Sequence, residues 1–117
     1  MKFSIVVAIV AETLEDKAVD IAKENGAGGV TLLKSRGMGL NEKKTFFGLT
    51  YERAESVLMF ILERRMSIKI MKALTQQLKL EEHGNGIIFT LPIEHLAGIP
   101  SAQLELFENQ IKMEGQL

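Results

Sequence analysis

Both alternating sets of positions in the first ten residues are apolar, which is the pattern of a strand covered on its two faces. One set is Phe3, Ile5, Val7 and Ile9, and the other contains Val6, Ala8 and Val10. The pattern predicts a buried strand from Lys2 to Val10. The run is short and is followed by no small-residue cleavage site, which favours a core strand over a signal peptide.

The next apolar positions follow helical spacing. Thr13 is a candidate N-cap, Asp16 lies three residues later, and Asn25-Gly26 is a typical C-terminal stop. These signals predict an amphipathic helix whose apolar positions are Leu14, Ala18, Ile21 and Ala22. Gly29 to Lys34 is a second predicted strand, and the polar, aperiodic stretch from Ser35 to Gly48 is a predicted exposed loop.

Residues Tyr51 to Arg65 suit either a helix or a buried strand. A helix that also included Met66 to Leu78 would be about twice the average length of helices in globular proteins. We therefore predict a strand to about Leu62 and a helix over Met66 to Leu78, where apolar and polar positions alternate with helical period.

The last predicted strand covers Gly86 to Leu91 and stops at Pro92, because proline cannot donate to a ladder. A short helix is predicted over Ser101 to Lys112. The order βαββαβ indicates an α+β, ferredoxin-like two-layer sandwich. The chain is predicted to be a single domain over residues 1–117, with a core at 2–94 and a C-terminal tail at 95–117.

Two helices can cover only one face of a four-stranded sheet. All four predicted strands carry apolar residues on both faces. Each has a pair on one face, beside apolar neighbours on the other; the pairs are Val6 and Ala8, Val30 and Leu32, Leu58 and Phe60, and Ile87 and Phe89. The second face therefore has to be covered by something else. The tail is too short and polar to do so, and the sequence predicts self-association.

Composition excludes several classes of function. The chain has no cysteine, so it has neither disulfides nor thiolate metal sites. Its 14 Lys and Arg residues balance 15 Asp and Glu residues, for a net charge of -1, which gives no indication of a nucleic-acid partner. The longest apolar run, Val57 to Leu62, is too short to cross a membrane. We expect a cytoplasmic protein that is not itself membrane-embedded.

Candidate chemistry is concentrated in one turn. Glycines in Gly84-Asn85-Gly86 allow close backbone approach, so the turn either aims amide N–H groups at an anion or is simply a tight turn into the next strand. The two histidines, His83 and His95, have no carboxylate or cysteine at metal-ligand spacing, and we expect them to be exposed. Neither a catalytic constellation nor a metal site can be assembled, so we do not expect an enzyme.

Three segments together resemble the nitrogen regulatory protein P-II superfamily. They are Gly28-Gly29-Val30-Thr31, Arg36-Gly37-Met38-Gly39 and the run from Gly84 to Glu94 (GNGIIFTLPIE). The resemblance covers Lys2 to Glu94 in order and spacing. It implies a homotrimer whose sheets line the centre and whose intersubunit clefts take an adenine nucleotide, namely ATP, ADP or AMP.

The resemblance also implies roles for individual residues. Thr31 would contact the base, Gly37, Met38 and Gly39 would form the base of a regulatory loop, and Gly84, Asn85 and Gly86 would lie beside the phosphates. The loop at residues 40–50 would control a protein target, a transporter or an enzyme, through Lys43, Lys44, Thr45, Phe46 and Phe47. One of the two phenylalanines is expected to be buried. The substitution Gly86→Asp is expected to abolish binding and leave the fold intact.

Two departures from the family pattern bear on the ligand. Ile87 stands where many P-II proteins have a lysine, and no arginine follows Arg65. Each missing cation removes a charge-assisted contact worth about 1.5 to 3 kcal/mol. The ligand could then be a nucleotide with fewer phosphates or another anion. The alternative function is a structural or divalent-cation-tolerance-type trimer of the same superfamily that senses nothing.

Overall fold

The computed structural model describes residues 1–36, 45–46, 49–50, 54–82 and 85–115. Its elements are β1 (Phe3–Ala11), the 3-10 turn η1 (Glu12–Leu14), α1 (Glu15–Glu24), β2 (Thr31–Arg36), β5 (Ala54–Glu63), α2 (Arg64–Gln77), β6 (Gly86–Ile93) and α3 (Ser101–Gly115). Two further strands of two residues each, β3 (Thr45–Phe46) and β4 (Leu49–Thr50), pair with one another.

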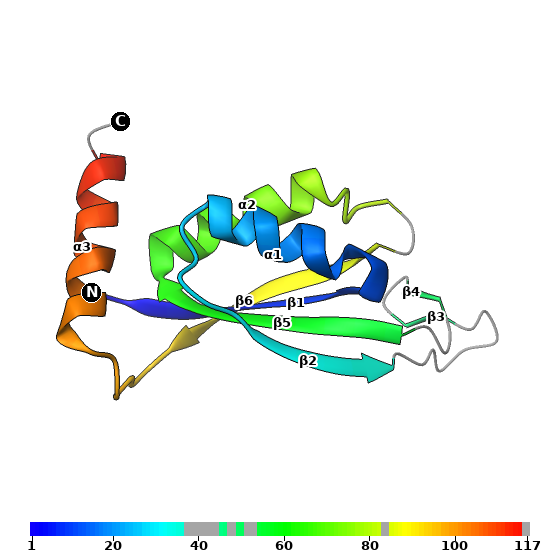
Figure 1. Cartoon of the computed structure of the whole chain (residues 1–117), viewed down its shortest axis with the longest axis horizontal. Helices are drawn as coiled ribbons and strands as arrows, with labels where there is room; N and C mark the ends of the chain where they lie inside the picture. Colours follow the sequence, from blue (N-terminus) through cyan, green and yellow to red (C-terminus); the bar gives the residue numbers. More distant parts are fainter. Residues whose placement is uncertain (37–44, 47–48, 51–53, 83–84, 116–117) are drawn as a thin grey trace.

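The four long strands form one antiparallel sheet in the order β2-β5-β1-β6. Helices α1 and α2 lie side by side over one face of this sheet, and α3 stands across the end of the sheet that is nearest the N-terminus (Figure 1). This topology is the ferredoxin-like α+β arrangement, so the predicted fold class is confirmed.

The core lies between the sheet and the pair α1 and α2. On β1 the side chains of Val6, Ala8 and Val10 face the helices with no exposed surface, and Leu58 and Phe60 of β5 lie beside them. The helices contribute further buried side chains, including Ala18, Ile21, Ile70 and Leu74. Burying a large aliphatic side chain stabilises a fold by about 1.5–3 kcal/mol, so this layer is the main source of the domain's stability.

The ambiguous segment is divided between strand and helix, as predicted. Strand β5 continues through Glu63, and α2 begins at Arg64. The Glu63 carboxylate accepts hydrogen bonds from the backbone N–H of Arg65 at 2.8 Å and of Met66 at 3.4 Å. An N-cap of this kind satisfies amides that have no partner within the helix, so it fixes the boundary.

Three local predictions are wrong. Thr13 is not the N-cap of α1, because the 3-10 turn comes first and Leu14 caps the helix without a side-chain hydrogen bond. Strand β2 covers Thr31–Arg36, so it begins two residues after the predicted start and extends two residues into the predicted loop. Strand β6 continues through Pro92 to Ile93, paired with β1 on one side only. As an edge strand it tolerates the missing N–H of a proline.

The second face of the sheet is apolar and open, as predicted. Thr31, Leu33, Val57 and Met59 share this face, because Thr31 pairs with Met59 and Leu33 with Val57. Large side chains on it are exposed in the single chain, with 50% for Leu33, 47% for Ile61, 38% for Phe89 and 50% for Leu91. Helices α1 and α2 lie on the other side (Figure 1).

Among the helices of the described residues, none has the length and apolarity needed to cross a bilayer.

Candidate functional site

Thr31 begins the edge strand β2 and lines a cavity of about 490 Å³ at the end of the sheet. The segment Gly28 to Val30 leads into this strand and forms the cavity rim. Sheet residues form the floor, and the wall comes from α3 and the residue just before it. The full lining is Ile5, Gly28, Gly29, Val30, Thr31, Met59, Ile61, Ile99, Gln103 and Phe107.

The cavity suits a flat, uncharged organic group. Among its described lining residues none carries a charge, and the polar atoms come from the Thr31 hydroxyl, the Gln103 amide and the backbone. A mostly apolar pocket with few polar groups is the common form of a small-molecule site. Gly29 leaves space here, because a Cβ built on it would meet nothing within 4 Å.

Helix α3 is held against the cavity by an aromatic pair. Phe107 is only 4% exposed, and its ring packs edge-on against Phe3 with centroids 5.8 Å apart and an interplanar angle of 65°. The Gln110 amide donates to the Gly26 carbonyl at 3.4 Å one turn further along the helix. The Gly26 region and β1 therefore fix the position of the cavity wall.

The turn before β6 has a structural role that needs no ligand. The Asn85 side-chain N–H₂ donates to the carbonyls of Leu78 at 3.1 Å and Lys79 at 2.9 Å. These bonds give partners to two carbonyl groups at the C-terminal end of α2 that have none within the helix. Gly86 has a φ of +138°, and a Cβ there would lie 2.4 Å from the Ile9 carbonyl oxygen. The expectation that Gly86→Asp leaves the fold intact is therefore wrong, because any side chain at 86 collides with β1.

A groove of about 460 Å³ lies beside Gly86, between α2 and β6. Lys72 of α2 is the cation among its described lining residues, and Gln76 and Thr75 are also in the wall. Lys72 sits on the exposed face of the helix. The Lys72 ammonium attracts an anion to this groove, whereas the Glu81 carboxylate, which also lines it, repels one.

The Thr31 cavity and the Gly86 groove do not meet within one chain. Thr31 lies on one edge strand, β2, and Gly86 on the other, β6, with β5 and β1 between them. Three interstrand steps separate the two edges by about 14 Å. They are also offset along the strands, since Thr31 is level with Val7 and Gly86 with Val10.

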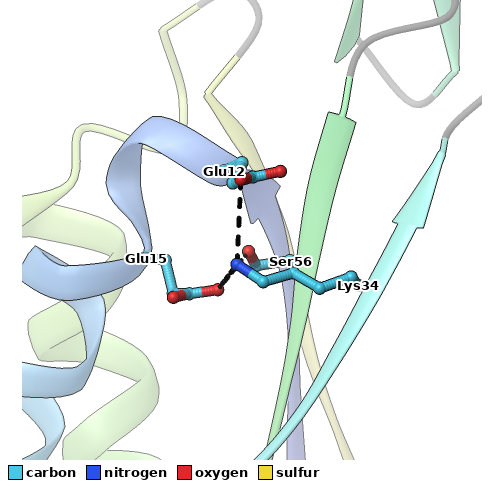
Figure 2. A network of polar contacts seen from close by, with 4 residues as sticks. All are labelled: Glu12, Glu15, Lys34 and Ser56. Carbon is cyan, nitrogen blue, oxygen red and sulfur yellow. Dashed lines mark hydrogen bonds and ion pairs between the residues drawn. The ribbon is translucent and has the colours of Figure 1, made fainter.

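A polar network holds the far end of β2 against the start of α1. The Lys34 ammonium pairs with the Glu15 carboxylate and lies 3.9 Å from a Glu12 oxygen (Figure 2). The buried Ser56 hydroxyl donates to the same Glu15 oxygen at 2.6 Å. The hydrogen bond from Lys34, then that from Ser56, lowers the pKa of Glu15, and the contact with Glu15 raises the pKa of Lys34.

This network sits directly before the segment that the resemblance assigns to regulation. Lys34 lies two residues before Arg36, the last residue of β2, after which residues 37–44 begin. The network therefore joins the end of β2 to the start of α1.

Several predicted site residues lie outside the described residues, namely Gly37, Met38, Gly39, Lys43, Lys44, Phe47, Gly84 and His83. Thr45 and Phe46 form β3, and nothing is described of their side chains. The burial of a phenylalanine in this loop stays a prediction. His95 is described, and its side chain is 90% exposed, as expected.

No sequence signal marks the residues that form the wall of the cavity. Ile99, Gln103 and Phe107 belong to the tail, where no motif distinguishes them, and only the packing of α3 brings them to Thr31. No group of three or more His, Cys, Asp or Glu side chains that could hold a metal ion occurs in the described part of the chain.

Comparison with known proteins gives a family match and a fold match. The family model described as nitrogen regulatory protein P-II matches residues 3–101. No curated protein sequence matches the chain at a significant level.

Many solved structures are similar in fold, among them the following three. CPII from Thiomonas intermedia K12, bound to ADP, AMP and acetate, is 15% identical with a TM-score of 0.65, over 85% of this chain and 91% of that one. The B. subtilis GlnK–ATP complex is 16% identical with a TM-score of 0.64, over 79% and 82%. Arabidopsis thaliana PII bound to citrate is 22% identical with a TM-score of 0.65, over 86% and 85%. At such identities the likeness establishes the fold alone.

Proposed function

Since the chain belongs to the nitrogen regulatory protein P-II family, we propose that it forms a homotrimer that binds an adenine nucleotide between subunits and so regulates a protein target. Proteins of this family are signalling regulators that act as trimers and interact with protein targets. The effector, the target and the assembly of this particular chain are the subject of the proposal.

The separation of the two half-sites is the observation that carries the proposal. A ligand that touches both the Thr31 cavity and the Gly86 turn needs them close together, yet they lie on opposite edges of one sheet. A neighbouring chain can bring its own Gly86 edge to the Thr31 edge. The exposed apolar face supplies the surface that would hold the chains together, because exposed apolar patches of this kind mark protein interfaces.

The chemistry of the half-sites supports a nucleotide. The uncharged Thr31 cavity suits the base, and the Lys72 ammonium in the groove beside Gly86 supports a phosphate there. Structural relatives are bound to ADP, AMP or ATP, and one to citrate. Because no arginine follows Arg65, we propose that AMP or ADP binds more tightly than ATP, and that another small anion is the remaining possibility for this site.

Regulation would act through residues 40–50. We propose that an occupied cleft favours one state of this segment, whose Lys43, Lys44, Thr45, Phe46 and Phe47 then contact the target, a transporter or an enzyme. The effector must bind one of the two states more tightly, since a ligand without differential affinity shifts no equilibrium. The Lys34–Glu15 network holds the end of β2, which precedes this segment in the sequence, against α1.

A thermal-shift panel with AMP, ADP and ATP tests nucleotide binding, since a ligand that binds only the folded form raises the melting temperature. The matched variant is Gly29→Phe, because position 29 has room for a side chain that would fill the cavity. We expect a rise for the wild type and none for the variant, whose melting temperature without ligand stays close to normal. A wild type that responds to no nucleotide would contradict the sensing function.

One observation favours the alternative of a structural or divalent-cation-tolerance-type trimer. The capping bonds of Asn85 and the close approach of Gly86 to β1 account for both residues without a ligand. A trimer that shows no thermal response to nucleotides, and binds Cu²⁺ or Zn²⁺ in a metal titration, would establish that alternative.

A further inference from the structure

The C-terminal helix contributes a polar group to a cavity that is mostly apolar. Gln103 lies in the first turn of α3 and lines the cavity opposite the Gly28-Gly29 rim. Its amide nitrogen lies 3.8 Å from the place where a Cβ on Gly28 would be, so the side chain reaches the rim. The residue is partly buried.

The Gln103 amide is available for a ligand. Within the described residues no hydrogen bond joins it to another group, whereas the second glutamine of the helix, Gln110, donates to the Gly26 carbonyl. The amide is not among the buried side-chain atoms without a partner, so water reaches it, and a ligand in the cavity can replace that water with a direct hydrogen bond.

The donor and acceptor pattern of an amide distinguishes between purines. A glutamine side chain offers one acceptor and one donor group side by side, which match the N6 amino group and the N7 atom of adenine. Guanine presents O6 and N7 on the same edge, and both are acceptors. In either orientation of the amide, its oxygen would then face a guanine acceptor. The Thr31 hydroxyl does not discriminate, because it rotates to donate or accept.

We propose that Gln103 is a specificity-determining residue that reads the edge of the base and selects adenine over guanine. This inference rests on the proposed nucleotide function and adds a role for α3. Ile61 of the floor and Phe107 of the wall pack against the base, and Gln103 hydrogen-bonds to its edge. The tail of the chain is thereby part of the binding site.

Calorimetric titration of ADP and GDP into the wild type, Gln103→Met and Gln110→Met tests the proposal. Methionine keeps the length of the side chain and removes its hydrogen bonds. Gln110→Met removes the other glutamine of α3, which does not line the cavity, and so controls for any general loosening of the helix. We expect the wild type to prefer ADP by about tenfold or more, the size of a bidentate contact.

In Gln103→Met the preference should fall to near unity through weaker ADP binding, with GDP binding little changed. Gln110→Met should keep the wild-type ratio. The inference is overturned if Gln103→Met retains the preference, if both variants lose it equally, or if the wild type does not discriminate. If the wild type binds ADP and GDP equally, only the inference fails, whereas a wild type that binds no nucleotide overturns the proposed function as well.

Discussion

Gly29 and Gly86 are both motif glycines, yet their surroundings differ. A Cβ on Gly29 would meet no atom within 4 Å, and the residue lines the cavity. A Cβ on Gly86 would meet the Ile9 oxygen at 2.4 Å, in a backbone conformation with φ of +138°. One glycine leaves space for a ligand, and the other permits the close approach of two strands.

The two glycines predict opposite results for the same substitution. Gly86→Ala should destabilise the fold by about 1–3 kcal/mol, because alanine is strained at positive φ and its methyl group collides with β1. Gly29→Ala should change the free energy of unfolding by less than about 0.5 kcal/mol. Urea unfolding of both variants at equal chain concentration measures the difference. Equal costs would contradict the geometry of the β1–β6 pair.

The ion pair between Lys34 and Glu15 predicts a pH dependence. Because the pKa of Glu15 is lowered in the fold, its contribution to stability is present above the ordinary carboxylate pKa of about 4.3 and is lost as pH falls through the lowered value. The pKa of Lys34 is raised, so its contribution is lost only as pH rises past about 10.4 and through the raised value.

Lys34→Met should therefore weaken the acid dependence of stability. Relative to the wild type, the variant loses stability near neutral pH and loses less on further acidification, because Glu15 then titrates closer to its ordinary pKa. Unfolding curves between pH 3 and 8 measure this. Parallel profiles for the two proteins would show that the contact contributes nothing to folding.

Sequence reasoning identified some site residues and missed others for physical reasons. Thr31 was found because a family motif surrounds it, and the structure places it in a cavity. The capping role of Asn85 was missed, since it depends on the approach of the Leu78 carbonyl seven residues earlier. Gln103 was missed because no local pattern marks a residue whose role comes from tertiary packing.

At the scale of elements, α3 is the least integrated part of the fold. Its main buried side chain is Phe107, which packs on Phe3, while Leu106 and Met113 are exposed at 55% and 69%. The other buried residues of the core come from the sheet and from α1, α2 and the residues just after α2. Loss of Phe107 should therefore release the helix without unfolding the sheet.

Phe107→Ala should detach α3 locally. We expect faster amide hydrogen exchange and proteolysis across residues 101–112, with protection of β1 and β5 unchanged, because the core between sheet and helices stays intact. Nucleotide binding should weaken as the cavity loses its wall. Uniform loss of protection along the chain would contradict this view of α3 as a separate unit.

The boundaries of helices and strands could be predicted from the sequence where neighbouring residues determine them. The division of residues 54–77 into β5 and α2 was predictable from length alone, and Gly26 ends α1 with a positive φ of 102°. The extension of β6 through Pro92 was not, because the tolerance of a proline depends on whether its strand lies at a sheet edge. A 3-10 turn stands before α1 in place of the expected Thr13 cap, and the local sequence pattern does not predict this turn.

For the whole molecule, the open face of the sheet is the dominant feature. Its apolar character was visible in the sequence, since every strand was apolar on both sides, and the structure confirms the exposure of Leu33, Ile61, Phe89 and Leu91. How the chains are arranged on this face was beyond the sequence, because pattern alone specifies neither the partner edge nor the angle between copies.

Leu32 and Leu33 provide a matched pair for testing the face. Both are exposed in the single chain, at 41% and 50%, but Leu32 pairs with Leu58 on the helix side and Leu33 with Val57 on the open side. Leu33→Asp should convert trimers to monomers, because the trimer would bury an unpaired charge at its interface. Leu32→Asp should leave the trimer intact, because its side chain is on the other face. Sedimentation velocity distinguishes the outcomes, and dissociation of both variants or of neither would contradict an interface on this face.

Native mass spectrometry of the wild-type chain with ADP tests the central claim most directly, because it reports assembly and occupancy in one spectrum. The account predicts a species of three chains that carries up to three ADP molecules, one for each pair of neighbouring edges. A single chain in dilute solution, or a trimer that takes up no nucleotide, would contradict it.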